Sequence, residues 1–246
     1  MNSKDIISKC NVLLEAYHKG KLGNTVMPED SNPGFDDKET CLVYFTLPMS
    51  LNYQRDSYKL WESGLKTYND KETRVIFNIE NSANLDEKQL RKHLLKYKIA
   101  LQPNKHVEIW QKISKTILEN WGNISNLLEF VDYDFLKLKE IIQKDYKKGF
   151  PYLSGPKIFN YWSFIIQEYG KIKLKNSEFI EIAPDTHITN CSVKLGVITE
   201  QEAGNLTKEK INERWREILK DSGINPIEMH PPLWFWSRNK FQFKLR

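Results

Sequence analysis

Apolar residues recur at the spacing of an α-helix through much of this chain, and this periodicity limits the fold more than any other feature. In the middle of the sequence, Leu90, Leu94 and Ile99 fall on one face of a helix. The pattern resumes after Pro103 and stops at Gly122, a residue that favours helix ends. Because no long run of alternating apolar and polar residues competes with these segments, the sequence predicts a mostly α fold.

Further helices are predicted on both sides of this region. Residues 20–39 contain glycine, proline and asparagine without periodicity and are predicted to be irregular. Val43–Thr46 have the composition of a strand, but Pro48 indicates a break in regular structure there. Thr199 and Glu202 have the spacing of a capping box that starts a helix. The other predicted helices cover residues 3–18, 127–131, 135–146, 158–169, 188–195 and 211–219.

Composition narrows the functional classes only slightly. The 246 residues can bury a substantial core without disulfides, and 37 basic against 32 acidic side chains give a net charge of +5, a mild bias toward anionic partners. Cys10, Cys41 and Cys191 form no C-x-x-C pair, so we expect reduced thiols rather than ligands of zinc or an iron–sulfur cluster. No apolar run is long enough to span a membrane, and we expect an intracellular protein (cytoplasm or nucleoid) without metal or cofactor.

A tight turn between two helices is the feature that points most directly to a ligand. The helix predicted to end near Lys147 and Lys148 is followed by Phe150–Lys157, FPYLSGPK, and then by an apolar helix. Backbone N–H groups at the start of the second helix, together with the helix dipole, can bind a phosphate without reading sequence. Gly155 permits a close approach to the backbone. We therefore predict that Ser154, Gly155, Lys147 and Lys148 bind phosphates of a nucleic-acid backbone.

This turn and a second motif together resemble a known protein family. Gly155–Lys157 (GPK) and Asp185–Ile188 (DTHI) are separated by an apolar helix, in the order found in helix-hairpin-helix DNA glycosylases, the HhH-GPD superfamily. The resemblance covers residues 149–195. In layout the chain is most similar to archaeal 8-oxoguanine DNA glycosylases with AP lyase activity, which have a comparably long interval between the two motifs. Leu153 stands where the family hairpin has its first glycine.

The resemblance implies that Lys157 and Asp185 are the catalytic pair. Lys157 would attack C1′ of the damaged nucleotide and form an imine that permits strand cleavage by β-elimination. Asp185 would stabilise the positive charge that develops on the sugar, or help to deprotonate the attacking group. A lysine attacks only when it is neutral, and Phe159, Trp162 and Phe164 are expected to form an apolar wall that lowers its pKa. Asp185 is also expected to cap the helix that follows it.

Three further residues receive roles from the same resemblance. Gln54 lies in a segment similar to the early helix of the archaeal enzymes, where a glutamine faces the extruded base; a plain surface glutamine is the alternative. Trp234 would stack on the extruded base, although tryptophans more often belong to a core. His187 would contact the DNA backbone or pack within the fold, rather than bind a metal.

The resemblance also implies two helical subdomains with a cleft between them. The first would comprise residues 42–157 and end in the helix-hairpin-helix, and the second would comprise residues 1–41 and 158–246. Double-stranded DNA containing a damaged base would bind across the cleft, and the protein would act as a monomer. The expected activity is that of a DNA N-glycosylase and AP lyase of base-excision repair, which flips 8-oxoguanine out of the duplex and removes it.

Three other functions fit the same residues. In the first, Lys157 contacts only the DNA backbone, and Asp185 activates a water molecule that removes another damaged or mismatched base. In the second, the chain is a non-catalytic helix-hairpin-helix module that binds duplex DNA. In the third, it is a glycosidase that acts on a modified nucleoside. Covalent trapping, base release and DNA binding at low salt distinguish the four functions.

Overall fold

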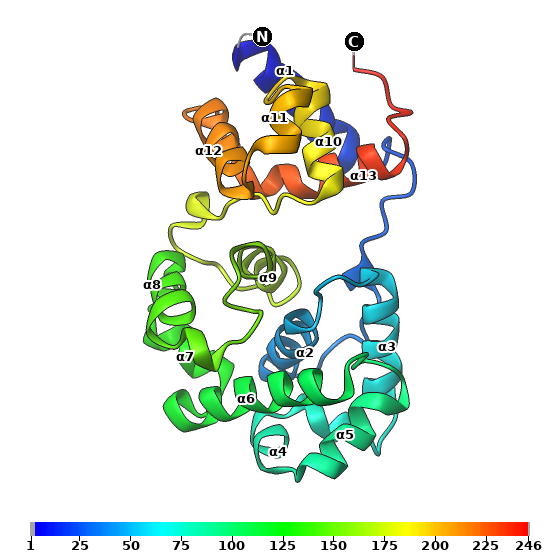
Figure 1. The fold of residues 1–246 in the computed structure, drawn as a ribbon, viewed down its shortest axis with the longest axis vertical. Coiled ribbons are helices and arrows are strands. Elements are labelled where there is room, and N and C mark those ends of the chain that lie inside the picture. Colours follow the sequence, from blue (N-terminus) through cyan, green and yellow to red (C-terminus); the bar gives the residue numbers. More distant parts are fainter. Residues whose placement is uncertain (1–2, 246) are drawn as a thin grey trace. The chain divides into compact units, whose positions relative to one another are not determined.

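The computed structural model describes residues 3–245, and their regular structure is almost entirely helical (Figure 1). The helices α1 to α13 are joined by loops and short 3₁₀ turns. Among the described residues the only β pairing is an isolated bridge between Asp134 and Lys175. The predicted mostly α fold is therefore confirmed. No helix within residues 3–245 is both long and apolar enough to cross a membrane.

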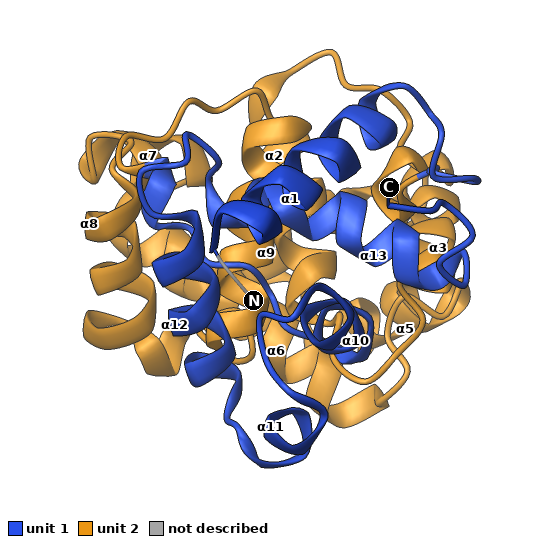
Figure 2. Ribbon diagram, turned by 90° about the horizontal axis from the view of Figure 1, so that it is seen from above, with its two compact units in different colours: residues 1–26, 177–246 blue, residues 27–176 orange. Residues whose placement is uncertain are grey.

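The chain forms two compact units (Figure 2). Unit 1 comprises residues 1–26 and 177–246, and unit 2 comprises residues 27–176. The helices of unit 1 are α1 (Ser3–His18), α10 (Thr186–Leu195), α11 (Glu200–Asn205), α12 (Lys208–Leu219) and α13 (His230–Arg238). The helices of unit 2 are α2 (Lys38–Ser50), α3 (Ser57–Asn69), α4 (Ile79–Asn84), α5 (Glu87–Lys96), α6 (Pro103–Trp121), α7 (Ile124–Phe130), α8 (Phe135–Glu140) and α9 (Pro156–Glu168).

Unit 2 extends beyond the predicted central subdomain at both ends. It includes residues 27–41 and the whole of α9, whereas the predicted subdomain covered residues 42–157. Helix α9 packs against α2, where Trp162 Nε1 donates a hydrogen bond to Thr46 Oγ1 at 2.9 Å and both side chains are buried. The hairpin and both helices that flank it, α8 and α9, therefore belong to a single unit.

Helix α2 forms the centre of the unit 2 core. Every residue from Cys41 to Ser50 is buried, and the helix packs against α3, α6, α7 and α9 (Figure 1). A helix surrounded on all sides is apolar on all sides, which explains the strand-like composition of Val43–Thr46. The expected break at Pro48 is wrong, because the helix continues to Ser50. Pro48 lies in the last turn, where its missing N–H costs the helix a single hydrogen bond.

Helix α7 begins on a carboxylate supplied by α2. Glu39 Oε1 accepts a hydrogen bond from the N–H of Ile124 at 2.8 Å, and Oε2 accepts from the N–H of Ser125 at 2.9 Å and from its hydroxyl at 2.7 Å. The first N–H groups of a helix have no acceptor within the helix and favour a negative charge nearby. This contact therefore fixes α7 against α2, although the two segments are far apart in sequence.

Replacing Glu39 by alanine is expected to lower the free energy of unfolding by about 2 kcal/mol, because three part-buried donors lose a charged acceptor. Urea unfolding followed by circular dichroism measures this change. Glu140→Ala is the matched control. That exposed carboxylate pairs with Lys144 one turn along the chain, and its loss should cost less than about 0.5 kcal/mol. Equal losses in the two variants would contradict the role assigned to Glu39.

Unit 1 is built on the packing of α10 against α13, with α1 against α12 and α13. Trp215 of α12 is fully buried and donates from Nε1 to Ser192 Oγ of α10 at 2.9 Å. The Cys191 thiol of α10 donates to the carbonyl oxygen of Leu233 in α13 at 3.1 Å. Buried polar groups of this kind need partners, so these two bonds fix the positions of three helices within the unit.

Most helices predicted from local patterns are found close to their expected ends. Helix α6 ends at Trp121, immediately before Gly122, and the capping box of Thr199 and Glu202 begins α11. Helices α2, α3, α4 and α13 were not predicted from the local pattern. In α13 the prolines at 231 and 232 occupy the first turn, where a missing N–H costs no helical hydrogen bond.

Candidate functional site

The connection between α8 and α9 is a tight hairpin, residues 146–155. Helix α8 continues into a π-helical turn, Ile141–Asp145, and a 3₁₀ turn, Lys147–Gly149, precedes the reversal of the chain. Within the hairpin the N–H of Ser154 donates to the carbonyl of Phe150 at 2.9 Å, and the N–H of Gly155 donates to the carbonyl of Tyr152 at 2.9 Å. The backbone N–H groups of Ser154 and Gly155 thus hold the hairpin closed, and a phosphate there would depend on other donors.

The unusual residue in the hairpin, Leu153, explains part of its shape. Its side chain is fully buried, so it anchors the turn in the core of unit 2. The residue with a left-handed backbone conformation in this turn is Tyr152, with φ of +62°, and not Leu153. Gly155 has an ordinary φ of −68°, but a Cβ atom there would lie 3.1 Å from the carbonyl oxygen of Tyr152. Gly155 is therefore needed for close packing of the turn rather than for its φ angle.

Lys157 is the second residue of α9, and it is exposed. Phe159 and Trp162 do not enclose it: both rings are fully buried in the core of unit 2, and Phe159 stacks on Phe135 with centroids 5.5 Å apart. The predicted apolar wall is therefore not formed by these two residues, because the helix turns them toward α2 and α8. Phe164 is half-buried and stacks on Tyr161.

Asp185 begins α10, as the sequence predicted. Its carboxylate accepts a hydrogen bond from the N–H of Ile188 at 2.9 Å, and its carbonyl accepts from Thr189 Oγ1 at 2.7 Å. The side chain is half-buried. Capping holds a carboxylate in one orientation at the positive end of a helix, so it is compatible with a second role in chemistry.

Two other predicted residues of unit 1 lie together beside this cap. The rings of His187 and Trp234 meet edge to face with centroids 5.7 Å apart, and the Arg238 guanidinium lies 4.9 Å from the centre of the Trp234 ring. His187 Nδ1 lies 3.0 Å from Ser237 Oγ, at hydrogen-bonding distance. His187 and Trp234 are both half-buried, so each presents part of its ring at the surface.

The remaining predicted residues belong to unit 2. Lys147 and Lys148 are exposed on the 3₁₀ turn of the hairpin. Gln54 is exposed in the loop between α2 and α3, where it has a left-handed φ of +52°. The neighbouring Tyr53 stacks on Tyr152 of the hairpin, with centroids 5.0 Å apart and an interplanar angle of 19°. The structure thus brings the Gln54 loop to the same surface as the hairpin.

The predicted site residues therefore form two sets. Asp185, His187 and Trp234 lie together in unit 1, whereas Lys157, Gln54 and the hairpin lie in unit 2. Sequence reasoning missed Tyr53, Tyr152, Ser237 and Arg238, all of which contact a predicted residue or its loop. Their proximity in sequence to Gln54, Gly155 and Trp234 was the available signal.

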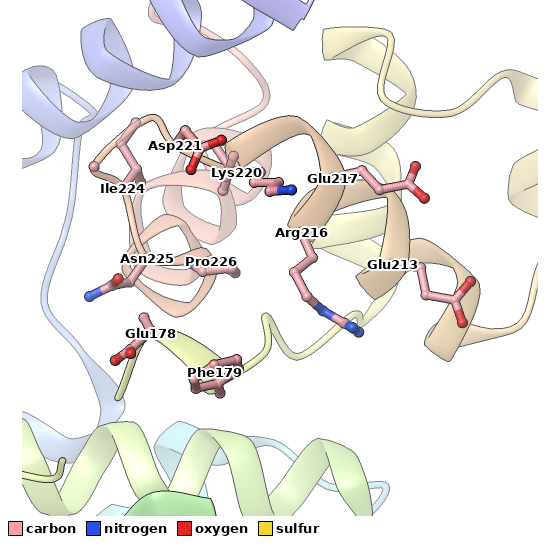
Figure 3. Close-up of a pocket in the computed structure, with 12 residues that line it drawn as sticks. Glu178, Phe179, Glu213, Arg216, Glu217, Lys220, Asp221, Ile224, Asn225 and Pro226 are labelled. Atoms are coloured by element: carbon pink, nitrogen blue, oxygen red, sulfur yellow. The ribbon is translucent and has the colours of Figure 1, made fainter. Parts of the chain in front are cut away.

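Unit 1 also contains a cavity of about 540 Å³, and its lining residues are different from the predicted site residues. It is formed by the end of α12 and the segments around Phe179 and Ile224 (Figure 3). Arg216, which lines the cavity, forms an ion pair with Glu181 at 2.5 Å. None of the residues predicted for catalysis or base recognition lines this cavity. Among the described residues, no group of three or more histidine, cysteine, aspartate or glutamate side chains is arranged to hold a metal ion.

The three cysteines are free and buried, with no disulfide partner assigned to any of them. Burial raises the pKa of the Cys41 thiol to about 11 and raises the pKa of Cys10 and Cys191 as well. Such thiols are neutral and poorly nucleophilic near neutral pH. No protein-family model matches this chain, and no curated protein is significantly similar to it.

Proposed function

We propose that this protein is a DNA glycosylase of base-excision repair that removes an oxidised purine, 8-oxoguanine, and then cleaves the strand. The observation that carries the proposal is the exposed Lys157 at the start of α9, directly after a tight hairpin that follows a helix. In this proposal the exposed lysines of the hairpin and the positive end of the α9 dipole attract a phosphate backbone, and the amine of Lys157 is accessible to a sugar carbon.

In the proposed reaction, the amine of Lys157 attacks C1′ of the extruded nucleotide, and the bond between C1′ and the base breaks with its electrons leaving on the base. Opening of the sugar ring gives an imine, and loss of a proton from C2′ then expels the 3′ phosphate by β-elimination. Asp185 stabilises positive charge on the sugar or accepts the proton that the amine loses. Lys157 must be neutral to attack, and a bound, water-excluding substrate is the source of that desolvation in this proposal.

The other predicted residues recognise the substrate in this proposal. Trp234 stacks on the extruded base, and the amide of Gln54 pairs with its polar edge. His187, Lys147 and Lys148 contact phosphates of double-stranded DNA. The protein acts as a monomer on DNA inside the cell, without metal or cofactor, because amine and carboxylate groups suffice for the chemistry.

Borohydride reduction during the reaction tests the proposal. Wild type is expected to form a covalent adduct with duplex DNA that contains 8-oxoguanine, and Lys157→Gln should lose that adduct completely. Lys137→Gln is the matched control, because Lys137 is an exposed lysine of α8 without a role in the proposal, and it should retain the adduct. A panel of duplexes with other lesions defines the preferred base. If wild type forms no adduct with any lesion, Lys157 is not the nucleophile.

The exposure of Lys157 favours a second candidate function. An exposed lysine, with Phe159 and Trp162 turned into the core instead of enclosing it, suits a phosphate contact better than nucleophilic attack. In this alternative, Asp185 activates a water molecule and the enzyme removes a damaged or mismatched base without cleaving the strand. Base release without borohydride trapping would establish it, whereas DNA binding without base release would indicate a non-catalytic module.

A further inference from the structure

Three segments of unit 2 meet at one surface, and one of them contains the hairpin turn. Residues 52–56 contact residues 150–157 through the stacked rings of Tyr53 and Tyr152. Residues 97–106 contact the first loop through Arg55, whose Nη1 donates to the carbonyl of Ile99 at 2.7 Å. They contact the hairpin through Lys105, whose Nζ lies 5.0 Å from the centre of the Tyr152 ring. The three segments therefore form one continuous surface.

Aromatic area is left uncovered at the centre of this surface. The Tyr53 side chain is 50% exposed, although it already stacks on Tyr152 with nearly parallel planes. Leu101, two residues before the start of α6, is 53% exposed on the second of the three segments. A ring that has one flat neighbour and an open surface can accept another flat, aromatic group. The pair of tyrosines is therefore a preformed stacking platform.

The charge around the platform is positive. The three segments carry four basic side chains, Arg55, Lys98, Lys105 and Lys157, against the single carboxylate of Asp56. That carboxylate caps α3 by accepting from the N–H of Lys59 at 3.1 Å.

Arg55 places a fixed positive charge beside the platform. Its guanidinium donates to backbone carbonyls, of Lys98 and Ile99, and its Nε is buried without a hydrogen-bond partner. Burial lowers the pKa of Arg55 to about 10, so it remains charged near neutral pH. Lys105 adds a second cation held against the platform by Tyr152. Cations beside an open aromatic ring fit a phosphate next to a base.

We infer that the stacked pair Tyr53–Tyr152 binds an unpaired nucleobase of a nucleic-acid strand, with Lys105 and the charge of Arg55 beside its phosphates. The inference rests on the proposed function in that the partner is DNA, and it adds a preference for strands with an unstacked base. Stacking tolerates any base, because every base has an aromatic face. The platform thus selects disturbed over fully paired DNA without reading the sequence.

Fluorescence of 2-aminopurine tests this inference directly. The probe is an undamaged duplex with a single unpaired 2-aminopurine, and the reference is the same duplex fully paired. Wild type is expected to quench the unpaired probe and to bind it more tightly than the paired duplex. Tyr53→Leu keeps an apolar side chain but has no ring, so it should lose the quenching and weaken binding about tenfold. Tyr53→Phe should retain both properties.

A second exposed ring provides the control. Phe130 on α7 is 66% exposed and is not part of the platform, so Phe130→Leu should behave as wild type. Equal binding of paired and unpaired probes, or unchanged quenching in Tyr53→Leu, would overturn the inference. The test is separate from that of the proposed function, because the probes contain no lesion. If the unpaired probe is quenched but no lesion-containing duplex loses its base, the platform is supported and the proposed glycosylase is rejected. If a lesion is released but the unpaired probe is not quenched, the proposed glycosylase is supported and the platform is rejected.

Discussion

Asp185→Asn is expected to reduce the rate of base release by about 100- to 1,000-fold while leaving the stability of the protein almost unchanged. The carboxylate caps α10 through a hydrogen bond from the N–H of Ile188, and an asparagine side chain accepts the same bond equally well. The substitution therefore removes the negative charge and keeps the cap. In the proposed reaction this carboxylate faces the positive charge that develops on the sugar, and loss of such a charge has an effect of this size.

Asp185→Ala serves as the control for capping. It removes both the charge and the hydrogen bond to Ile188, so it should also lower the free energy of unfolding by about 1 kcal/mol. Single-turnover base release from a lesion-containing duplex measures the rate, and thermal unfolding measures the stability. Should Asp185→Asn release the base as fast as wild type, the carboxylate is a helix cap and nothing more.

Glu29→Gln is expected to remove a pH dependence of stability worth about 3 kcal/mol. Glu29 is fully buried in unit 2, where Trp61 Nε1 donates to one carboxyl oxygen at 2.8 Å and the Tyr161 hydroxyl donates to the other at 3.1 Å. Loss of hydration on burial raises its pKa from 4.5 to about 7, more than these two donors lower it. The folded state therefore holds a proton that the unfolded chain releases at lower pH.

The direction of the effect follows from that raised pKa. Below pH 4.5 the carboxyl group is protonated in both states and costs nothing. As the pH rises to 7, the unfolded chain loses the proton first, and the folded state becomes less stable by about 1.4 kcal/mol for each unit of pKa difference. Wild type should therefore lose about 3 kcal/mol relative to Glu29→Gln between pH 4 and pH 8.

Urea unfolding at a series of pH values measures this difference. Glutamine imitates the protonated acid, since it can accept from Trp61 and donate to Tyr161. Glu119→Gln changes an exposed carboxylate on α6 and should show the same pH dependence as wild type. A stability difference between wild type and Glu29→Gln that does not change with pH would show that folding does not raise the pKa of Glu29.

The sequence by itself determined the features that depend on neighbours along the chain. The ends of α1 and α6, the cap at Asp185 and the capping box at Thr199 rest on contacts between residues three or four positions apart. Such contacts are present in the local pattern, because helical periodicity and capping need no distant partner. The mostly α fold follows from the same local preferences.

Only the tertiary structure decided which segments meet. The burial of Glu29, the cap that Glu39 provides for α7, and the stacking of Tyr53 on Tyr152 all join residues far apart in sequence. The core position of Phe159 and Trp162, which leaves Lys157 exposed, depends on the packing of α9 against α2. Periodicity identifies a buried face but not its partner, because the hydrophobic effect that buries it is non-directional.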